Sequence, residues 1–265
     1  MPSVPFVDIH CHLIPGIDDG AKSWQESLAM AEMAVADGTE TIIVTPHQLG
    51  AFSHNDGDTV RQRTRELQQQ LRDHDVPLQV LPGGDVRMEE GMLAGLRHGQ
   101  VMSLADHRKH VLLELPHELY FSMEGVLDGL AAAKMVGILS HPERNQGLLK
   151  QPAIVEQLVE YGCLMQITAG SLMGTFGPLC EQMAVWMLEE GLVHFLATDA
   201  HGPRARRPLM SRAFQRVSEL VGDETAIALC CDNPAAVATG QNIETIRRKP
   251  KRRGLASWFE WRKAG

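Results

Sequence analysis

The sequence predicts an α/β fold made of parallel βα units, and three observations support this prediction. Short β-branched or apolar runs of strand length recur along the chain, segments with helical periodicity separate them, and most of the runs end beside a histidine or a carboxylate. The chain has 265 residues, of which 44% are hydrophobic, so it can bury a sizeable core. Domains usually have roughly 100–200 residues, but α/β barrels often reach about 250 as one unit.

The strand pattern occurs seven times. The predicted strands are 6–9, 41–45, 78–82, 111–115, 136–140, 163–168 and 193–198. Each is short and bounded by polar or turn-forming residues, which is typical of strands that alternate with helices.

The first helical segment is the clearest of those between the strands. Ser23 and Glu26 form a Ser-x-x-Glu capping box at its start. Leu28 and Val35 belong to an apolar stripe, and Gly38 is placed to end the helix. Further helices are predicted near 58–73, 123–135, 152–161, 179–190 and 208–221, and a helical region over about 223–240 closes the body.

Six of the seven predicted strands have a histidine or a carboxylate at or near their C-terminal ends. In chain order these residues are His10, His12, His47, Asp85, Glu114, His141, Asp199 and His201. In barrel enzymes the active site is built at this end from several strands. We therefore expect the eight side chains to form one site.

This set of side chains predicts a metal centre. His10 and His12 are two residues apart on a strand, so they share one face, and Cys11 points the other way as a packing residue. Five histidines and three carboxylates exceed the needs of one zinc-like site, which indicates two or three ions with Glu114 as a bridge. Mixed nitrogen and oxygen ligands suit Mn²⁺, Fe or Zn²⁺, and the spacing does not choose among them.

Arginines follow two of the predicted ligands. Arg144 comes three residues after His141, and Arg204, Arg206 and Arg207 follow the Asp-Ala-His segment. Arginines beside metals favour a bidentate phosphate clamp, although pairing with surface acids is an alternative for Arg204 and Arg207. The combination predicts phosphate ester hydrolysis by attack of a metal-bound hydroxide.

Asp19 lies in a loop rich in proline and glycine that follows the first strand. One interpretation is that it only forms a turn. The other is that it serves as an acid or base toward the attacking water or the leaving group.

Charge is unevenly distributed. Residues 247–263 contain eight of the 25 basic residues and one of the 33 acidic ones, so this segment carries +7 and residues 1–246 carry −15. We predict a metallophosphatase domain over 1–246 and a basic, aromatic tail over 247–265. The acidic body argues against nucleic-acid binding. One interpretation of the tail is a disordered, solubilising end. The other, based on its basic residues and on Trp258, Phe259 and Trp261, is weak contact with an anionic membrane surface.

Several classes are excluded or disfavoured. No apolar run approaches the roughly 18 residues that span a bilayer, and no signal peptide is evident. Five scattered cysteines indicate a reduced, cytoplasmic protein. The chain has neither a dinucleotide-binding glycine motif nor a P-loop. No cysteine is followed six positions later by arginine, which excludes a cysteine-dependent tyrosine phosphatase.

The motifs that carry these residues resemble a known family. They are DIHCHLIPGIDDG (8–20), TPH (45–47), PGGDVR (82–87), LLELP (112–116), HPERN (141–145), QITAGSLMG (166–174) and TDAH (198–201). In order, over about residues 7–240, they look like the PHP-type bacterial protein-tyrosine phosphatases of capsule and exopolysaccharide operons. These belong to the polymerase-and-histidinol-phosphatase (PHP) superfamily. The resemblance implies a distorted (β/α)7 TIM-like barrel, a trinuclear, usually manganese-dependent centre, and dephosphorylation of a membrane-embedded bacterial tyrosine kinase.

The resemblance also assigns roles. It implies metal ligation by His10, His12, His47, Glu114, His141, Asp199 and His201, phosphate binding by Arg144 and Arg206, and a supporting acid or base role for Asp19. Two positions depart from the family pattern, since Asp85 stands where the family usually has Glu, and Gln48 where it often has a second His. Asp85 is one methylene shorter, so it either ligates after a small backbone shift or leaves one metal weaker.

Three alternatives remain open. One is a small-molecule phosphatase of the histidinol-phosphatase type. Another is a metal-dependent amidohydrolase, which also begins with His-x-His on a barrel strand. The chain lacks a lysine at the end of a middle strand to bridge metals, and amide hydrolysis gives no reason for Arg144 and Arg206. The last is a kinase-binding module without activity, against which the complete ligand set argues.

Overall fold

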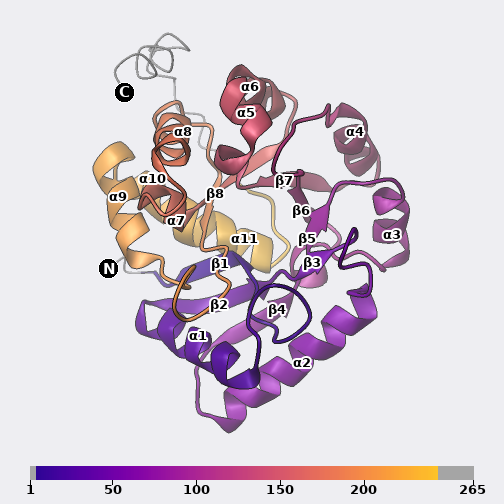
Figure 1. Cartoon of the computed structure of the whole chain (residues 1–265), viewed down its shortest axis with the longest axis vertical. Coiled ribbons are helices and arrows are strands. Elements are labelled where there is room, and N and C mark those ends of the chain that lie inside the picture. The colour runs from indigo at the N-terminus through magenta and orange to yellow at the C-terminus, as the bar shows by residue number, and fades with distance from the viewer. Residues whose placement is uncertain (1–3, 244–265) are drawn as a thin grey trace.

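The computed structural model describes residues 4–243. Their nine strands pair in parallel in two sheets (Figure 1). One sheet has the order β1 (Phe6–Cys11), β2 (Thr39–Val44), β4 (Gln79–Pro82). The other has the order β3 (His47–Gln48), β5 (Asp85–Arg87), β6 (His110–Glu114), β7 (Val136–Ser140), β8 (Leu164–Thr168), β9 (Phe195–Ala197). The predicted α/β class and all seven predicted strands are confirmed.

Two short strands were not expected, because they continue the second and third predicted strands after a break. Pro46, which has no N–H to donate, separates β2 from β3, and Gly83 with Gly84 separates β4 from β5. A Cβ atom on Gly84 would lie 2.3 Å from the side-chain oxygen of Gln48, so any larger residue would have to displace the Gln48 side chain. The breaks move His47 and Asp85 into the second sheet, where they are register partners.

Helices surround the strands (Figure 1). They are α1 (Trp24–Ala36), α2 (Gly57–Asp73), α3 (Met92–His98), α4 (Glu124–Ala132), α5 (Gln146–Lys150), α6 (Ala153–Glu160), α7 (Ala169–Leu172), α8 (Pro178–Glu189), α9 (Ser211–Val221), α10 (Asp223–Ile227) and α11 (Asn233–Ala238). The 3₁₀ turns η1 (Leu104–Asp106) and η2 (Pro142–Arg144) and the π-helical turn η3 (Ala228–Asp232) complete the set. All predicted helices are present. The sequence did not predict α3, α5 and α7, because none of them exceeds two turns and such short helices show no clear periodicity.

The start of α1 follows the predicted capping pattern in part. The Oγ atom of Ser23 accepts a hydrogen bond from the backbone N–H of Glu26 at 3.3 Å. The carboxylate of Glu26 accepts from the N–H of Lys22 at 2.9 Å, whereas a capping box directs it to the N–H of the cap residue itself. Gly38 has a φ of 100°, as a glycine that ends a helix often does.

The buried interior between the strands unites both sheets. Ile9 and Ile43 of the first sheet pack in one cluster with Leu112, Ile138 and Phe195 of the second. The backbone also joins them at the ends of β1 and β9, where the N–H of residue 12 donates to the carbonyl of residue 200 at 2.9 Å. The C-terminal ends of the parallel strands therefore lie on one side of the molecule.

None of the helices within residues 4–243 is long and apolar enough to cross a membrane. The predicted tail, 247–265, lies outside the described residues, so the predicted boundary at residue 246 stays a prediction.

Candidate metal centre

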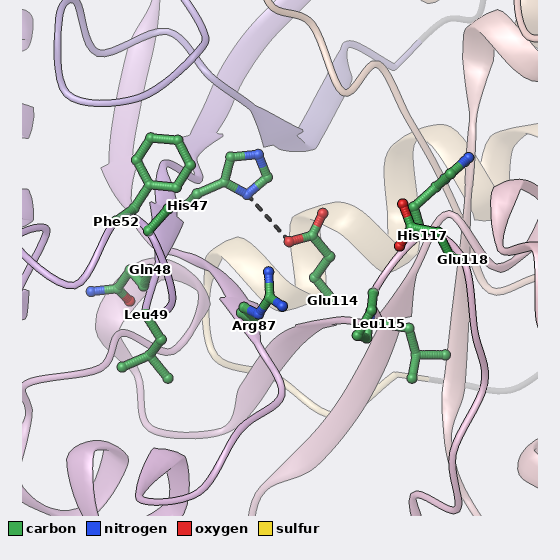
Figure 2. Close-up of a pocket in the computed structure, with 11 residues that line it drawn as sticks. His47, Gln48, Leu49, Phe52, Arg87, Glu114, Leu115, His117 and Glu118 are labelled. Carbon is green, nitrogen blue, oxygen red and sulfur yellow. Dashed lines mark ion pairs between the residues drawn. The ribbon is translucent and has the colours of Figure 1, made fainter.

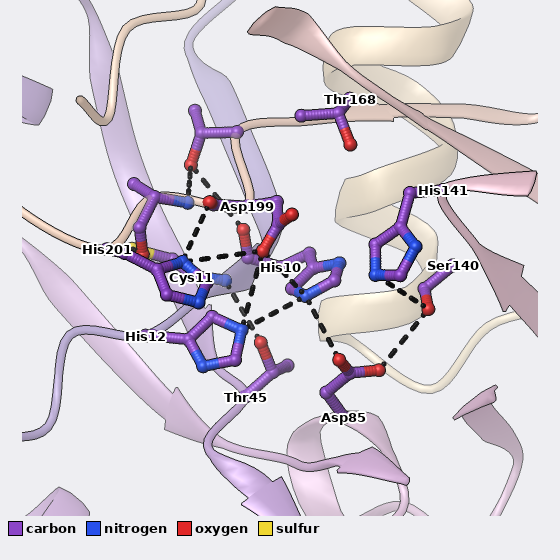
Figure 3. A network of polar contacts seen from close by, with 12 residues as sticks. His10, Cys11, His12, Thr45, Asp85, Ser140, His141, Thr168, Asp199 and His201 are labelled. Atoms are coloured by element: carbon purple, nitrogen blue, oxygen red, sulfur yellow. Dashed lines mark hydrogen bonds and ion pairs between the residues drawn. The ribbon is translucent and has the colours of Figure 1, made fainter. Parts of the chain in front are cut away.

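All eight residues predicted as metal ligands come together at the C-terminal ends of the strands, and Asp19 joins them (Figure 3 shows six of the eight). Their ligand atoms fall into four overlapping groups, in each of which the atoms lie within 4.8 Å of one another. These groups are His12, Asp19, His47 and His201; His10, His12 and Asp85; His10, His141 and Asp199; and His47, Asp85 and Glu114. Such overlap is what a cluster of several ions requires.

The centre begins at the end of β1. The Nε2 atoms of His10 and His12 point at each other and lie 3.2 Å apart (Figure 3). One oxygen of Asp199 lies 3.3 Å from Nε2 of His10 and 3.5 Å from Nε2 of His12. Cys11 is fully buried in an apolar cluster, as its predicted packing role requires.

A second group of ligand atoms surrounds His47. Its Nδ1 atom lies 3.3 Å from Asp85 and 3.4 Å from Glu114. The other oxygen of Glu114 lies 3.8 Å from Nε2 of His141, so this carboxylate lies between two histidines. That position suits the bridging role expected of Glu114.

Asp85 reaches the centre despite its short side chain. It is fully buried, and its Oδ2 atom lies 3.5 Å from Nε2 of His10. Its other oxygen accepts a hydrogen bond from the hydroxyl of Ser140 at 3.3 Å. The Asp85 side chain is thus held among the other ligands by the residue that precedes His141.

Asp19 lies at the open side of the centre, with its side chain 55% exposed. One of its oxygens is 3.4 Å from Nε2 of His47 and 3.3 Å from Nε2 of His201. Contacts with these two histidines, His201 first, hold the pKa of Asp19 well below its ordinary value. Asp19 is therefore an ionised acceptor, suited to a base or a ligand rather than to a proton donor.

Buried acceptors fix the rings of the first two histidines. Asp18 accepts from Nδ1 of His12 at 2.8 Å, and the side-chain oxygen of Gln166 lies 2.8 Å from Nδ1 of His10. Each contact leaves Nε2 directed at the centre, as the partners of metal-binding histidines commonly do. Sequence reasoning assigned no role to either residue, although both lie inside the motifs that carry the resemblance.

Asp8 holds two parts of the centre together and was also missed. Its buried carboxylate accepts from the N–H of His10 at 3.2 Å and from the N–H of Thr198 at 3.1 Å. It also accepts from the hydroxyl of Thr198. Asp8 thereby fixes β1 and the segment before Asp199 relative to each other.

The backbone is strained at two ligands. His141 has a φ of 35° and Asp199 a φ of 49°, which are left-handed conformations that residues with a Cβ atom rarely adopt. Strain of this kind clusters at functional sites, where the surrounding structure maintains it. Here it turns both side chains into the centre.

The electrostatics of the centre favour bound cations. Burial opposes ionisation of Asp85 and Asp199, but neighbouring charges, with His10 foremost, lower the pKa of both carboxyls well below the ordinary value. Burial, and then the charge of Asp85, raise the pKa of Glu114. Oδ2 of Asp85 and Nε2 of His201 are buried and make no hydrogen bond in the described part of the chain, although they lie 3.3 Å from Nδ1 of His47 and from an oxygen of Asp19, respectively. These atoms therefore fit divalent ions, which would engage their free lone pairs.

Two predicted arginines border the centre. Both Arg144 and Arg206 contact the same oxygen of Asp199. The Phe176 ring lies over both guanidinium groups, with centroid distances of 4.2 Å to Arg144 and 5.8 Å to Arg206. The Asp199 carboxylate and the Phe176 ring thus hold the two guanidinium groups side by side. Sequence reasoning did not identify Phe176. Arg204 and Arg207 are exposed.

Gln48 has a structural role. It is buried, donates to the carbonyl of Asn55 at 2.6 Å and accepts from the N–H of Met102 at 2.8 Å. The departure from the family pattern at this position therefore adds a side chain that ties loops together beside the ligand His47.

The centre opens into a pocket of about 300 Å³ (Figure 2). His47 and Glu114 face each other at one side of it, and Arg87 and Phe52 also line it. Two of the predicted ligands, His47 and Glu114, are therefore reached from this pocket.

A sequence model described as "Capsular polysaccharide synthesis, CpsB/CapC" matches residues 6–239. The chain belongs to this CpsB/CapC family. The resemblance inferred from the motifs is thereby confirmed.

Two relatives match most of this chain and their own full length. It is 34% identical to the tyrosine-protein phosphatase YwqE of Bacillus subtilis (strain 168) over 255 residues, covering 96% of this chain and 100% of that protein. It is 27% identical over 248 residues to the tyrosine-protein phosphatase CpsB of Streptococcus pneumoniae, covering 89% of this chain and 100% of that protein.

Solved structures give the same result. A structure from a study of YwqE of Bacillus subtilis and CpsB of Streptococcus pneumoniae, described as metal-dependent tyrosine phosphatases, superposes with a TM-score of 0.87. It is 33% identical and covers 93% of this chain and 100% of its own. At 10% identity and a TM-score of 0.55, a phosphotriesterase homology protein of Escherichia coli shares the fold alone, covering 89% of this chain and 99% of its own.

Proposed function

We propose that the protein is a manganese-dependent protein-tyrosine phosphatase that hydrolyses phosphotyrosine to tyrosine and phosphate. One observation supports this most strongly. Arg144 and Arg206 both contact the carboxylate of Asp199, at the edge of the cluster of ligand side chains. The names of the family relatives agree, since YwqE and CpsB are called tyrosine-protein phosphatases.

The ligand set would be the eight predicted residues, with His10, His12 and Asp199 at the core. Two or three ions match the four overlapping groups of ligand atoms, and Mn²⁺ suits their nitrogen and oxygen donors, with Fe or Zn²⁺ as alternatives. When bound, such ions supply Lewis acidity that lowers the pKa of water and neutralises charge on a phosphoryl group.

The residues around the ligands would do the remaining work. Arg144 and Arg206 present planar guanidinium forks that bind phosphoryl oxygens bidentately and stabilise their charge. Asp19, ionised between His47 and His201, would accept a proton from the attacking water or act as a further ligand. Asp18 and Gln166 would keep the histidine rings oriented throughout.

We further propose that the two sheets act as one distorted (β/α)7 barrel. The shared interior of Ile9, Ile43 and Phe195 supports this, as do the backbone hydrogen bonds between the end of β1 and the segment after β9. Such a barrel would place all ligands at its C-terminal mouth.

A membrane-embedded bacterial tyrosine kinase of capsule or exopolysaccharide synthesis is the proposed physiological substrate. The family description supports a role in capsule synthesis. The basic tail, 247–265, would add weak contact with anionic lipid headgroups. Unchanged liposome binding at low salt after deletion of 247–265 would exclude the membrane contact.

A substrate panel tests the proposed activity. The metal-loaded protein is assayed with a phosphotyrosyl peptide, with histidinol phosphate and with a cyclic amide. We expect the peptide to be the best substrate. Preference for histidinol phosphate would instead identify a small-molecule phosphatase, and hydrolysis of the amide alone an amidohydrolase.

A further inference from the structure

A second hollow, separate from the pocket beside His47, lies on the arginine side of the centre. Its volume is about 600 Å³, within the range of ligand sites. It lies between η2, α5 and the start of α8, elements that contact one another. Its walls include Arg144, Gln146, Leu149, Lys150, Phe176 and Leu179. We call it the α5–α8 hollow.

The α5–α8 hollow is continuous with the proposed phosphate site. Arg144 lines it and also contacts the ligand Asp199. Phe176 lines it as well and lies over both arginines. His117 borders this hollow and the pocket beside His47 (Figure 2), so the two openings adjoin. A chain segment attached to a phosphotyrosine at the arginines would pass directly into the hollow.

The walls of the α5–α8 hollow combine basic and apolar side chains. No acidic side chain lines the α5–α8 hollow, although residues 1–246 carry a net charge of −15. Lys150 is exposed and has no ion-pair partner among residues 4–243. Leu179 leaves 49% of its surface exposed at the first turn of α8. The hollow thus presents an unpaired cation beside exposed apolar surface.

We propose that the α5–α8 hollow binds the residues that flank phosphotyrosine in the substrate and selects an acidic and an aliphatic side chain. The carboxylate would pair with Lys150, whose ammonium group only donates hydrogen bonds. The aliphatic group would cover Leu149 and Leu179. This inference rests on the proposed phosphatase function, because it assumes that phosphate lies at Arg144 and Arg206.

Two phosphotyrosyl peptides test this proposal. Both peptides carry leucine on one side of the phosphotyrosine. On the other side, one peptide has glutamate and the other has lysine. The metal-loaded full chain should show a higher kcat/KM for the glutamate peptide. Lys150→Glu should lower the ratio of the two kcat/KM values by about fivefold, the upper range for an exposed ion pair. Using the ratio cancels any general effect of a substitution on the centre.

Matched variants and substrates separate the possible failures. Lys134 is exposed and lies before β7, at the opposite end of the strands from the centre. Lys134→Glu should therefore leave the ratio of the two kcat/KM values unchanged. Leu179→Ser should lower kcat/KM for the leucine peptides relative to peptides with serine at that position. Equal rates with both charged peptides, or a ratio that Lys150→Glu does not move, would overturn the acidic preference. An unmoved leucine-to-serine ratio in Leu179→Ser would overturn the aliphatic one. Failure to hydrolyse any of these phosphotyrosyl peptides, and free phosphotyrosine as well, would instead overturn the proposed function.

Discussion

Oδ2 of Asp85 lies 3.3 Å from Nδ1 of His47, although Asp85 is one methylene shorter than the glutamate that the family usually has at this position. The two residues are register partners on β3 and β5, and the breaks that precede these strands bring them together. The sequence left open whether an aspartate at this position can reach the metals. The position of this oxygen, which is buried and accepts no hydrogen bond from the described residues, favours ligation.

Substitution of Asp85 should separate charge from length. Asp85→Asn should lower the metal content, because the amide has no negative charge to offer. Asp85→Glu should keep the metals but lower the free energy of unfolding by about 1–3 kcal/mol, because the fully buried site must take up an extra methylene. Metal analysis and urea unfolding measure the two effects. A gain of bound metal and turnover in Asp85→Glu would show that the shorter side chain leaves one site weak.

Asp18 should tune metal affinity without binding the metal. Asp18→Asn replaces the carboxylate that orients His12, and we expect metal affinity to fall about 10- to 100-fold, as it does for such supporting residues. Competition with a chelator of known affinity measures it. Asp37→Asn is the control, because Asp37 also accepts backbone hydrogen bonds, from Met210 and Ser211, but lies away from the ligands. Equal losses in both variants would contradict the orienting role.

The two arginines should affect turnover and not metal content. Arg144→Lys and Arg206→Lys keep the charge but lose the planar fork, so each should lower kcat/KM on the order of 100-fold. Arg204→Lys, at an exposed position in the same segment, should have little effect. Steady-state kinetics at matched metal content provides the comparison. Loss of metal in parallel with loss of activity would place the arginines in the structural support of Asp199 instead.

His194 should make the metal-free protein less stable in acid. Its Nδ1 atom accepts from the N–H of Met165 at 3.1 Å, and burial lowers the pKa of the ring to about 4. The unfolded chain, with an ordinary pKa near 6.5, therefore takes up protons first, and stability is lost as pH falls from 6.5 toward 4. His194→Asn keeps an acceptor that does not titrate.

Between pH 7.5 and 5.5, wild type should lose about 1 kcal/mol more unfolding free energy than His194→Asn. Urea titrations in the presence of chelator measure this difference, and the chelator removes the pH dependence of metal binding. Equal losses in the two proteins would mean that His194 is protonated in the folded state.

The fold and the ligands were largely predictable because they leave local signals. Seven apolar runs each produced a strand, and residues such as His10 and Glu114 stand at fixed places relative to strand ends. The breaks at Pro46 and Gly83 were not recognised, since a strand that changes sheets differs little in sequence from one that ends.

The supporting residues could not be predicted for another reason. Gln166 is 156 residues from His10, and Phe176 touches Arg144 and Arg206 from a loop with no periodic pattern. Contacts of this kind depend on the closed tertiary structure. Asp18 was a partial exception, because it stands beside Asp19 in a motif, but the sequence did not show which aspartate faces His12.

The central claim is that the cluster around His10 and Asp199 binds the metals that support phosphotyrosine hydrolysis. The direct measurement is hydrolysis of a phosphotyrosyl peptide before chelation, after chelation, and after addition of Mn²⁺, Fe²⁺ or Zn²⁺ to separate samples. We expect activity to disappear in chelator and to return best with Mn²⁺. The variant in which His10 and His12 are both alanine should not recover. Full activity that persists in chelator without bound metal would contradict the account.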